Sequence, residues 1–210
     1  MYLNIRGKKV TYSRVSKHLC ALAGPGNITH ETLLNLFLKT DAVFQEALLA
    51  HNRFRSIHHV LPLQWNATLA EQAQNIAESV AGDPSTFQGE PAGENIAQIW
   101  HDLQRAPLKA TTIWYGENKG YSFSYPELND KVKHFTQMVW KDTTQLGMGA
   151  APSPSGKYVI VVALYRPLGN DIHRLRDNVQ RAGPVQDVYA TIKEKIFKPN
   201  DDKKTNRRKI

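Results

Sequence analysis

The sequence predicts an α/β protein built as a three-layer α-β-α sandwich. Three observations support this fold class. Stretches with the period of about 3.6 residues that marks amphipathic helices precede two segments that form a candidate β-hairpin. The second hairpin strand, "YVIVVALY", is almost wholly apolar, which is typical of a strand covered on both faces. Helices before and beside such a hairpin can cover both faces of its sheet, and this arrangement gives the layered sandwich.

The first predicted helix begins near Asp41, with Thr40 or Asp41 as its N-cap. Its apolar stripe has helical spacing and consists of Phe44, Leu48, His51 and Phe54. The segment "NATLAEQAQNIAESVA" predicts a second helix, entered at Asn66 or Thr68. Residues 1–38 lack a strong period apart from the apolar patch "LLNLFL".

The following segments complete the sandwich. Glycine and proline predict a loop at "GDPSTFQGEPAG", and "ENIAQIW" after it fits a helix or a strand. A third helix is expected from Leu108 to about Glu117, followed by the aromatic loop "NKGYSFSYPELND". A short helix over residues 131–140 leads into the hairpin of "QLGMGAAP" and "YVIVVALY".

The domain boundaries follow from this pattern. We expect an extension over residues 1–38, the sandwich domain over residues 39–172 and a basic extension over residues 173–210. The last part contains an amphipathic helical stripe, followed by a polar tail. The stripe consists of Val185, Val188, Tyr189, Ile192 and Ile196.

The amino-acid composition indicates the class of protein and the cellular compartment that we expect for it. The hydrophobic fraction of 41% and charged fraction of 22% are typical of a soluble globular protein, and no apolar run approaches the roughly 20 residues that span a bilayer. A single cysteine, Cys20, excludes a disulfide framework and cysteine-based zinc sites. Because the first residues also lack a secretory apolar core, we expect an intracellular protein, cytoplasmic or peripheral on membranes, rather than a mitochondrial or secreted one.

The formal net charge of +8 is concentrated in the flanks. Residues 1–30 carry five Lys or Arg and no acids, and residues 171–210 carry eleven against six acids. Residues 31–170 carry eleven against thirteen acids. An anionic lipid or membrane surface would therefore be met by the ends of the chain, in particular the basic tail. We expect no nucleic-acid partner, because the flanks lack interleaved aromatic residues or a known module.

Four segments together resemble the CAP superfamily of cysteine-rich secretory, antigen 5 and pathogenesis-related proteins, also called SCP-domain proteins. They are "HNRFR" (51–55), "GENI" (93–96), "HFTQMVWKDT" (134–143) and "ALYRPLGN" (163–170), and they occur in the family's order. The last segment has no cysteine, which resembles the intracellular, Golgi-associated plant pathogenesis-related-like branch. The resemblance implies the same α-β-α sandwich that the pattern predicts.

The resemblance also implies a central cavity in which two His and two Glu can hold a divalent metal. Glu94, Glu117 and His134 match three of these ligands, and Gln137 is expected near the cavity rim. The second His would lie in the loop before "GEN", which is "AGDPSTFQGEPA" and has none; Asp83 or Glu90 are the alternatives. Because zinc prefers three or four ligands with imidazole among them, we expect no required cofactor and at most weak zinc binding. A metal-free polar pocket around His134 is the alternative.

Other polar residues in these motifs have structural interpretations. We expect His51 to be a hydrogen-bonded core histidine, and Asn52 and Arg55 to tie the first helix to neighbouring loops. Trp140 is expected to anchor the core, and His101 to lie on the surface.

The aromatic loop suggests a function. The family's sterol-binding members carry such a loop between the second Glu and the signature His. Tyr121, Phe123 and Tyr125 match its character and are the candidate lipid-binding residues, although they could instead pack on the domain.

The predicted function is therefore a non-enzymatic protein that binds lipid or membrane surfaces, without catalytic residues. A metal-dependent, protease-like hydrolase is the alternative, but the absent loop histidine removes its most natural base. A second copy of the chain, in a homodimer, is a further candidate partner.

Overall fold

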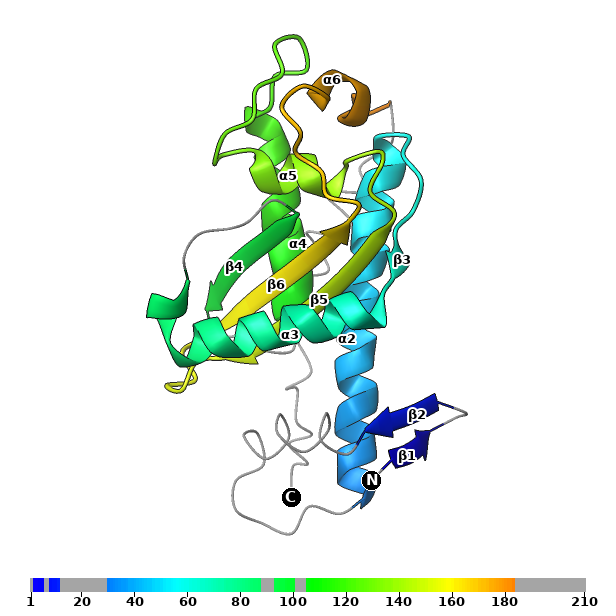
Figure 1. Cartoon of the computed structure of the whole chain (residues 1–210), viewed down its shortest axis with the longest axis vertical. Coiled ribbons are helices and arrows are strands. Elements are labelled where there is room, and N and C mark those ends of the chain that lie inside the picture. Colours follow the sequence, from blue (N-terminus) through cyan, green and yellow to red (C-terminus); the bar gives the residue numbers. More distant parts are fainter. Residues whose placement is uncertain (1, 6–7, 12–29, 88–92, 101–104, 184–210) are drawn as a thin grey trace, which may run out of the picture. The chain divides into compact units, whose positions relative to one another are not determined.

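The structure is a computed structural model that describes residues 2–5, 8–11, 30–87, 93–100 and 105–183, with side chains from residue 42 onward (Figure 1). The chain divides into two compact units, Met1–Gln45 and Glu46–Ile210. The predicted amphipathic stripe from Val185 to Ile196, the tail, Glu90 and His101 lie outside the described residues.

The first unit contains a hairpin that the sequence did not predict. Strand β1 (Tyr2–Ile5) pairs antiparallel with β2 (Lys8–Thr11). Helix α2 (His30–Ile57) begins in this unit, so the predicted start near Asp41 was wrong by eleven residues. No glycine or proline occurs within α2, and its backbone can therefore continue through "LLNLFL" although the apolar period there is weak.

The second unit is built on a four-stranded sheet with the order β3-β5-β6-β4. The strands are β3 (Gln64–Trp65), β4 (Glu94–Trp100), β5 (Gln145–Pro152) and β6 (Tyr158–Arg166). Strand β6 pairs antiparallel with both β4 and β5, and β3 runs parallel to β5. The segment "ENIAQIW" is therefore a strand. The apolar strand β6 is central and buried along most of its length, as predicted.

Helices cover both faces of this sheet, which confirms the α-β-α sandwich (Figure 1). Helix α3 (Ala67–Gly82) packs on one face. Of the two predicted entry residues, Asn66 is the N-cap, and its side chain accepts the N–H groups of Thr68 and Leu69. A Cβ on Gly147 or Gly149 would lie 2.2 or 2.3 Å from the backbone of α3, so these glycines allow α3 to lie directly on β5. Helix α4 (Ala106–Gly116) and the end of α2 cover the other face.

Short helices complete the unit. The 3-10 turns are η1 (Pro84–Thr86) and η2 (Glu117–Gly120), and the last helices are α5 (Lys133–Met138) and α6 (Leu175–Asn178). Helices α4 and α5 match the predicted third and short helices within a few residues. Among the residues that the structure describes, no helix combines the length and the apolar character that a membrane span requires.

Candidate functional site

The Glu117–His134 pair lies where the turn after α4 meets the start of α5. The Nδ1 atom of His134 lies 2.5 Å from Oε1 of Glu117. The second carboxylate oxygen accepts the backbone N–H groups of His134 and Phe135, at 3.0 and 3.1 Å. Helix α5 has valine at its N-cap, which offers no side-chain acceptor. Glu117 therefore supplies from another element the acceptor that a helix N-terminus needs, and it orients the imidazole at the same time.

A buried hydrogen-bond network joins this pair to the core. The side-chain amide of Asn95 donates to the carbonyl of His134 at 3.1 Å and to the hydroxyl of Tyr165 at 3.3 Å. The hydroxyl of Tyr165 lies 2.9 Å from Nε2 of His51. Nδ1 of His51 faces the carbonyl of Ala47 at 2.8 Å and so carries the proton. Nε2 is then the acceptor, and Tyr165 donates to it. The network runs from α2 through β6 and β4 to α5.

The structural interpretations of the "HNRFR" segment are confirmed. His51 is fully buried, and burial lowers its pKa to about 4, so the ring is neutral. Asn52 exchanges two hydrogen bonds with the backbone of Leu63, at 3.0 and 2.7 Å.

Arg55 has the largest structural role in this segment. Its guanidinium is 0% exposed and donates to four backbone carbonyls, and burial lowers its pKa to about 10. The acceptors lie 2.7–2.9 Å away and belong to Leu61, Met138, Trp140 and Thr143. Trp140 itself is 1% exposed, as predicted for a core anchor.

The other predicted cavity residues, Glu94 and Gln137, occupy different positions in the fold. Glu94 opens β4 and is half-buried, and alternation along the strand places it on the opposite face from Asn95. Gln137 is fully buried rather than at a rim. Its amide oxygen accepts the N–H of Gly169 at 2.9 Å, and its nitrogen donates to the hydroxyl of Thr143 at 3.2 Å. Gln137 thus holds the closing segment "ALYRPLGN" against α5.

The described donors do not fit a zinc site. No three His, Cys, Asp or Glu side chains gather closely enough to hold a metal ion within the described part of the chain. Zinc requires three or four ligands, and the structure brings Glu117 and His134 together. Asp83, one candidate replacement, instead caps η1 by accepting the N–H of Ser85 at 2.9 Å, and hydrogen bonds from Ser85 lower its pKa. Weak zinc binding stays a prediction.

The surroundings of the pair are polar as well as aromatic. The indole of Trp114 lies 6.1 Å from the His134 ring, centroid to centroid. In the described structure its buried N–H has no acceptor, and the buried Oδ1 of Asn95 has no donor. These two buried groups have no partner among the described residues, and the metal-free polar pocket stays a prediction.

The aromatic loop divides into a packed part and an exposed part. Tyr121 is buried and Phe123 is half-buried. Their rings lie 4.9 Å apart, and each contacts Phe135 edge-on. Tyr125 is 79% exposed. Two of the three candidate residues thus pack on the domain, whereas Tyr125 faces solvent. A lipid-binding role for the loop stays a prediction.

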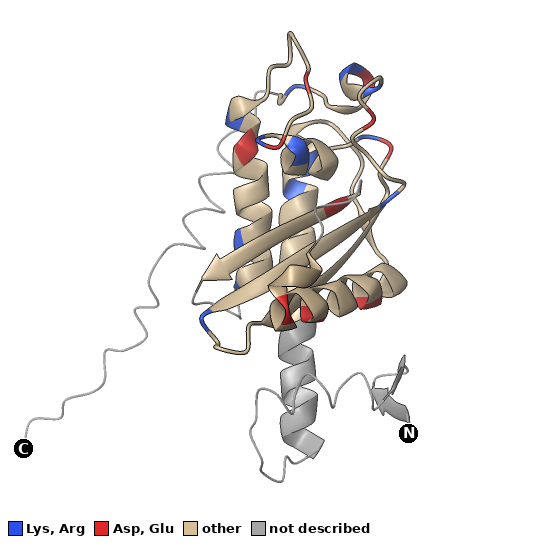
Figure 2. Ribbon diagram, turned by 60° about the vertical axis from the view of Figure 1, so that its left-hand side comes forward, with Lys and Arg blue, Asp and Glu red and all other residues tan. Residues whose placement is uncertain are grey.

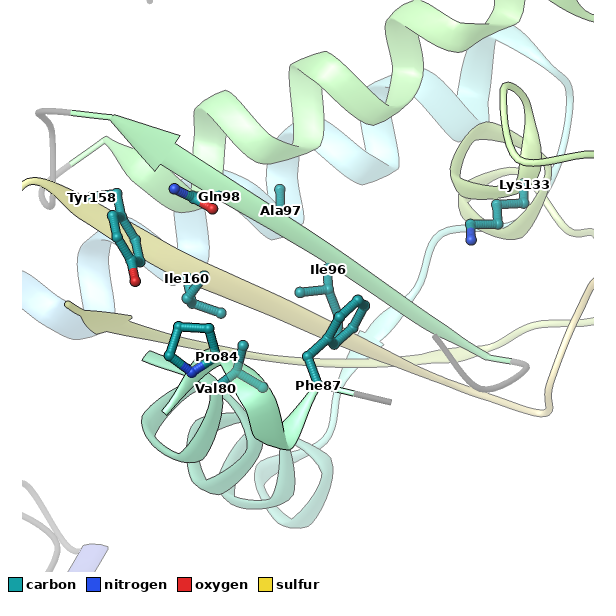
Figure 3. Close-up of a pocket in the computed structure, with 9 residues that line it drawn as sticks. All are labelled: Val80, Pro84, Phe87, Ile96, Ala97, Gln98, Lys133, Tyr158 and Ile160. Atoms are coloured by element: carbon teal, nitrogen blue, oxygen red, sulfur yellow. The ribbon is translucent and has the colours of Figure 1, made fainter. Parts of the chain in front are cut away.

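A second feature is an apolar groove between α3 with η1 and the strands β4 and β6 (Figure 3). Its volume is about 430 Å³. In Figure 3 most lining residues cluster around Ile96, and Lys133 lies apart from them. The sequence did not predict this groove, because its walls combine buried core residues such as Val80 and Ile160 with exposed residues such as Phe87 and Gln98. The lining residues are Val80, Pro84, Phe87, Ile96, Ala97, Gln98, Lys133, Tyr158 and Ile160.

Known proteins resemble this chain in sequence. A model of the CAP, or cysteine-rich secretory protein, family matches residues 48–165. The human Golgi-associated plant pathogenesis-related protein 1 is 36% identical over 134 residues, which cover 61% of this chain and 84% of that protein. Pathogenesis-related protein 1 of Arabidopsis thaliana is 32% identical over 164 residues, which cover 78% of this chain and 95% of that protein.

Solved structures show the same fold. The Hookworm Platelet Inhibitor aligns with a TM-score of 0.54 at 19% identity, over 63% of this chain and 72% of that one. Na-ASP-1 aligns with a TM-score of 0.51 at 22% identity, over 67% of this chain and 42% of that one. The family match covers more than half of the chain, and the four segments meet in one hydrogen-bonded frame. The chain therefore belongs to the CAP family of cysteine-rich secretory proteins.

Proposed function

We propose that this chain is a non-enzymatic CAP protein that binds lipid, taking a single acyl chain in the apolar groove. The groove is the observation that carries this proposal. Its volume of about 430 Å³ lies within the range of roughly 300–1,000 Å³ that small-molecule sites occupy.

The groove has the composition that an acyl chain requires. Val80 and Ile160 are buried members of the core cluster, so the floor is firmly packed. Ile96 and Tyr158 lie half-buried above that cluster, and Phe87 is 43% exposed at the margin. An acyl chain that covers these side chains gains about 25 cal/mol for each Å² of apolar surface removed from water. Lys133, which also lines the groove, is paired with Asp130 at 3.0 Å, so the proposal rests on the apolar residues.

The Glu117–His134 pair supports a non-catalytic role. Both oxygens of Glu117 already accept hydrogen bonds, two of them from the backbone at the start of α5. That geometry stabilises the helix and orients the ring. The short bond between the two side chains also resembles the base and orienter of a hydrolytic site, which is the observation that favours a metal-dependent hydrolase as the second candidate. Zinc-dependent ester hydrolysis that is lost in Glu117→Ala would establish that candidate.

Binding of cis-parinaric acid, a fluorescent fatty acid, tests the proposal. Phe87→Ser should weaken binding several-fold because it removes an apolar wall of the groove. Ile113→Ser is the matched control: Ile113 is also an exposed apolar residue, at 52%, but it lies on α4 outside the groove. Equal binding by both variants, or no binding by the unmodified protein, would refute the groove as the lipid site.

A further inference from the structure

Two arginines converge on a single serine of the aromatic loop. Nη2 of Arg176 donates to the carbonyl oxygen of Ser124 at 3.2 Å, and Nη2 of Arg181 donates to its hydroxyl at 3.0 Å. Each guanidinium has five N–H donors, so most of them stay available. Arg174, which precedes them on the same segment, is paired with the carboxylate of Asp142. Within the described part of the chain, Arg176 and Arg181 form no such ion pair.

The segment that carries these arginines is held firmly on the domain. The carbonyl and the side-chain oxygen of the buried Asn178 accept the N–H groups of Lys141 and Asp142, at 3.1 and 3.0 Å. The carbonyl of Gln180 accepts a hydrogen bond of 2.6 Å from Nδ1 of the buried His58.

The side chain of Arg181 is positioned as well. Its guanidinium carbon lies 5.4 Å from the centre of the Phe123 ring, a cation–π contact. The folded segment thus holds two positive charges near one residue before any ligand binds. An anion that contacts both does not have to order them, and this lowers the entropic cost of binding.

We infer that Arg176, Arg181 and the hydroxyl of Ser124 bind one phosphate group, and that an anionic lipid head group supplies it. Guanidinium forks match the oxygens of a phosphate, and the serine hydroxyl can donate a further bond. The next residue, Tyr125, projects an exposed ring of the kind that enters a membrane interface. A free phosphate ester offers the same chemistry, so the test must separate the two sources. Figure 2 shows that acidic residues are also present around α6. They include Asp177, which is exposed and would moderate the affinity.

This site deepens the proposed lipid function but is separate from the apolar groove, so the two can fail independently. The measurements use the full chain with two probes. Flotation with phosphatidylcholine vesicles, with and without phosphatidic acid, reports the lipid source. Titration with glycerol 3-phosphate, followed by NMR of the arginine side chains, reports the free ester.

We expect the Arg176→Gln, Arg181→Gln double variant to bind vesicles that contain phosphatidic acid at least about tenfold more weakly, the change that loss of one charge-assisted bond produces. The double variant Arg53→Gln, Lys157→Gln is the matched control, because it removes two exposed positive charges that have no described contact with Ser124. Melting temperatures verify that the variants fold.

Each result decides the inference. Equal weakening by the Arg53→Gln, Lys157→Gln control would show that the protein senses only overall charge and would overturn the site. Unchanged binding in the Arg176→Gln, Arg181→Gln variant would overturn it as well. Glycerol 3-phosphate that shifts Arg176 and Arg181 without vesicle binding would keep the phosphate site and refute the lipid source. Loss of cis-parinaric acid binding in Phe87→Ser, with vesicle binding intact, would concern the groove alone and leave this site supported.

Discussion

The buried guanidinium of Arg55 offers the sharpest test of how the family motifs hold this domain together. In Arg55→Met, a side chain of similar length with no donors would face four backbone carbonyls. Two of these keep another partner or reach solvent: the Trp140 carbonyl also accepts the N–H of Thr143 at 3.1 Å, and Leu61 is an exposed residue. The carbonyls of Met138 and Thr143 would lose the charged donor that binds them at 2.9 and 2.8 Å.

The magnitude follows from these two carbonyls. A buried polar group that loses its partner costs about 1–3 kcal/mol, so two of them cost about 4 kcal/mol of unfolding free energy. Since small domains have a total stability of roughly 5–15 kcal/mol, the variant should remain folded but unfold at a much lower urea concentration. Arg55→Lys should fall between the two, because a lysine retains the charge but has three donors in place of a five-donor fork.

Urea unfolding followed by tryptophan fluorescence provides the measurement, since Trp140 is buried beside the affected carbonyls. Arg53→Met is the control: it makes the same chemical change two residues earlier, at an exposed position of the same helix, and should alter stability by less than about 0.5 kcal/mol. A loss below about 1 kcal/mol for Arg55→Met, or equal losses for the two variants, would refute the assignment of Arg55 as the central hydrogen-bond donor.

Four further outcomes are expected. Trp140→Ala should cost about 3–5 kcal/mol in the same assay, and a loss under 1 kcal/mol would contradict core burial. Burial lowers the pKa of His51 from 6.5 to about 4. The neutral ring therefore contributes about 3 kcal/mol of unfolding free energy above pH 6.5, and this contribution is lost as the pH falls from 6.5 to 4. The urea midpoint should fall over this pH range in the unmodified protein and should depend less on pH in His51→Gln. Calorimetry should detect only weak zinc binding, whereas tight stoichiometric zinc would show that residues outside the described part complete the site. Pelleting with phosphatidylserine vesicles should be stronger for the full chain than for one ending at Gly183, and equal pelleting would contradict a role for the basic tail.

The sequence predicted the parts of the fold that depend on periodicity and local punctuation. Helix α3 has a strong apolar period and an asparagine N-cap, and β6 has the continuous apolar run of a covered strand. The start of α2 was missed because the apolar period weakens before Asp41, although nothing in that stretch breaks a helix. The hairpin of β1 and β2 was missed because two four-residue strands contain too few residues to establish an alternation.

The candidate site was predictable only in part, because its hydrogen bonds join segments far apart in sequence. The family motifs placed Glu117 and His134 in one cavity, and the two side chains are in contact. That the same carboxylate also caps α5 has no sequence signal, since the acceptor lies sixteen residues before the first residue of the helix, Lys133. The convergence of Arg176 and Arg181 on Ser124 is likewise invisible in the sequence, because more than fifty residues separate the partners.

The polar residues of the family motifs have structural roles, whereas we expect two other surfaces to bind ligands. Arg55 binds carbonyls next to α5, Asn95 binds the carbonyl of His134, and Gln137 binds the N–H of Gly169. Three of the four motifs therefore supply a polar side chain that satisfies the backbone of another motif, and loss of any one would leave buried groups unpaired in its neighbours. Such residues are explained by the fold whatever the protein binds. The apolar groove and the arginines at Ser124 differ from these residues, because Phe87, Arg176 and Arg181 are exposed. It is at these exposed positions that substitutions should change ligand binding more than stability.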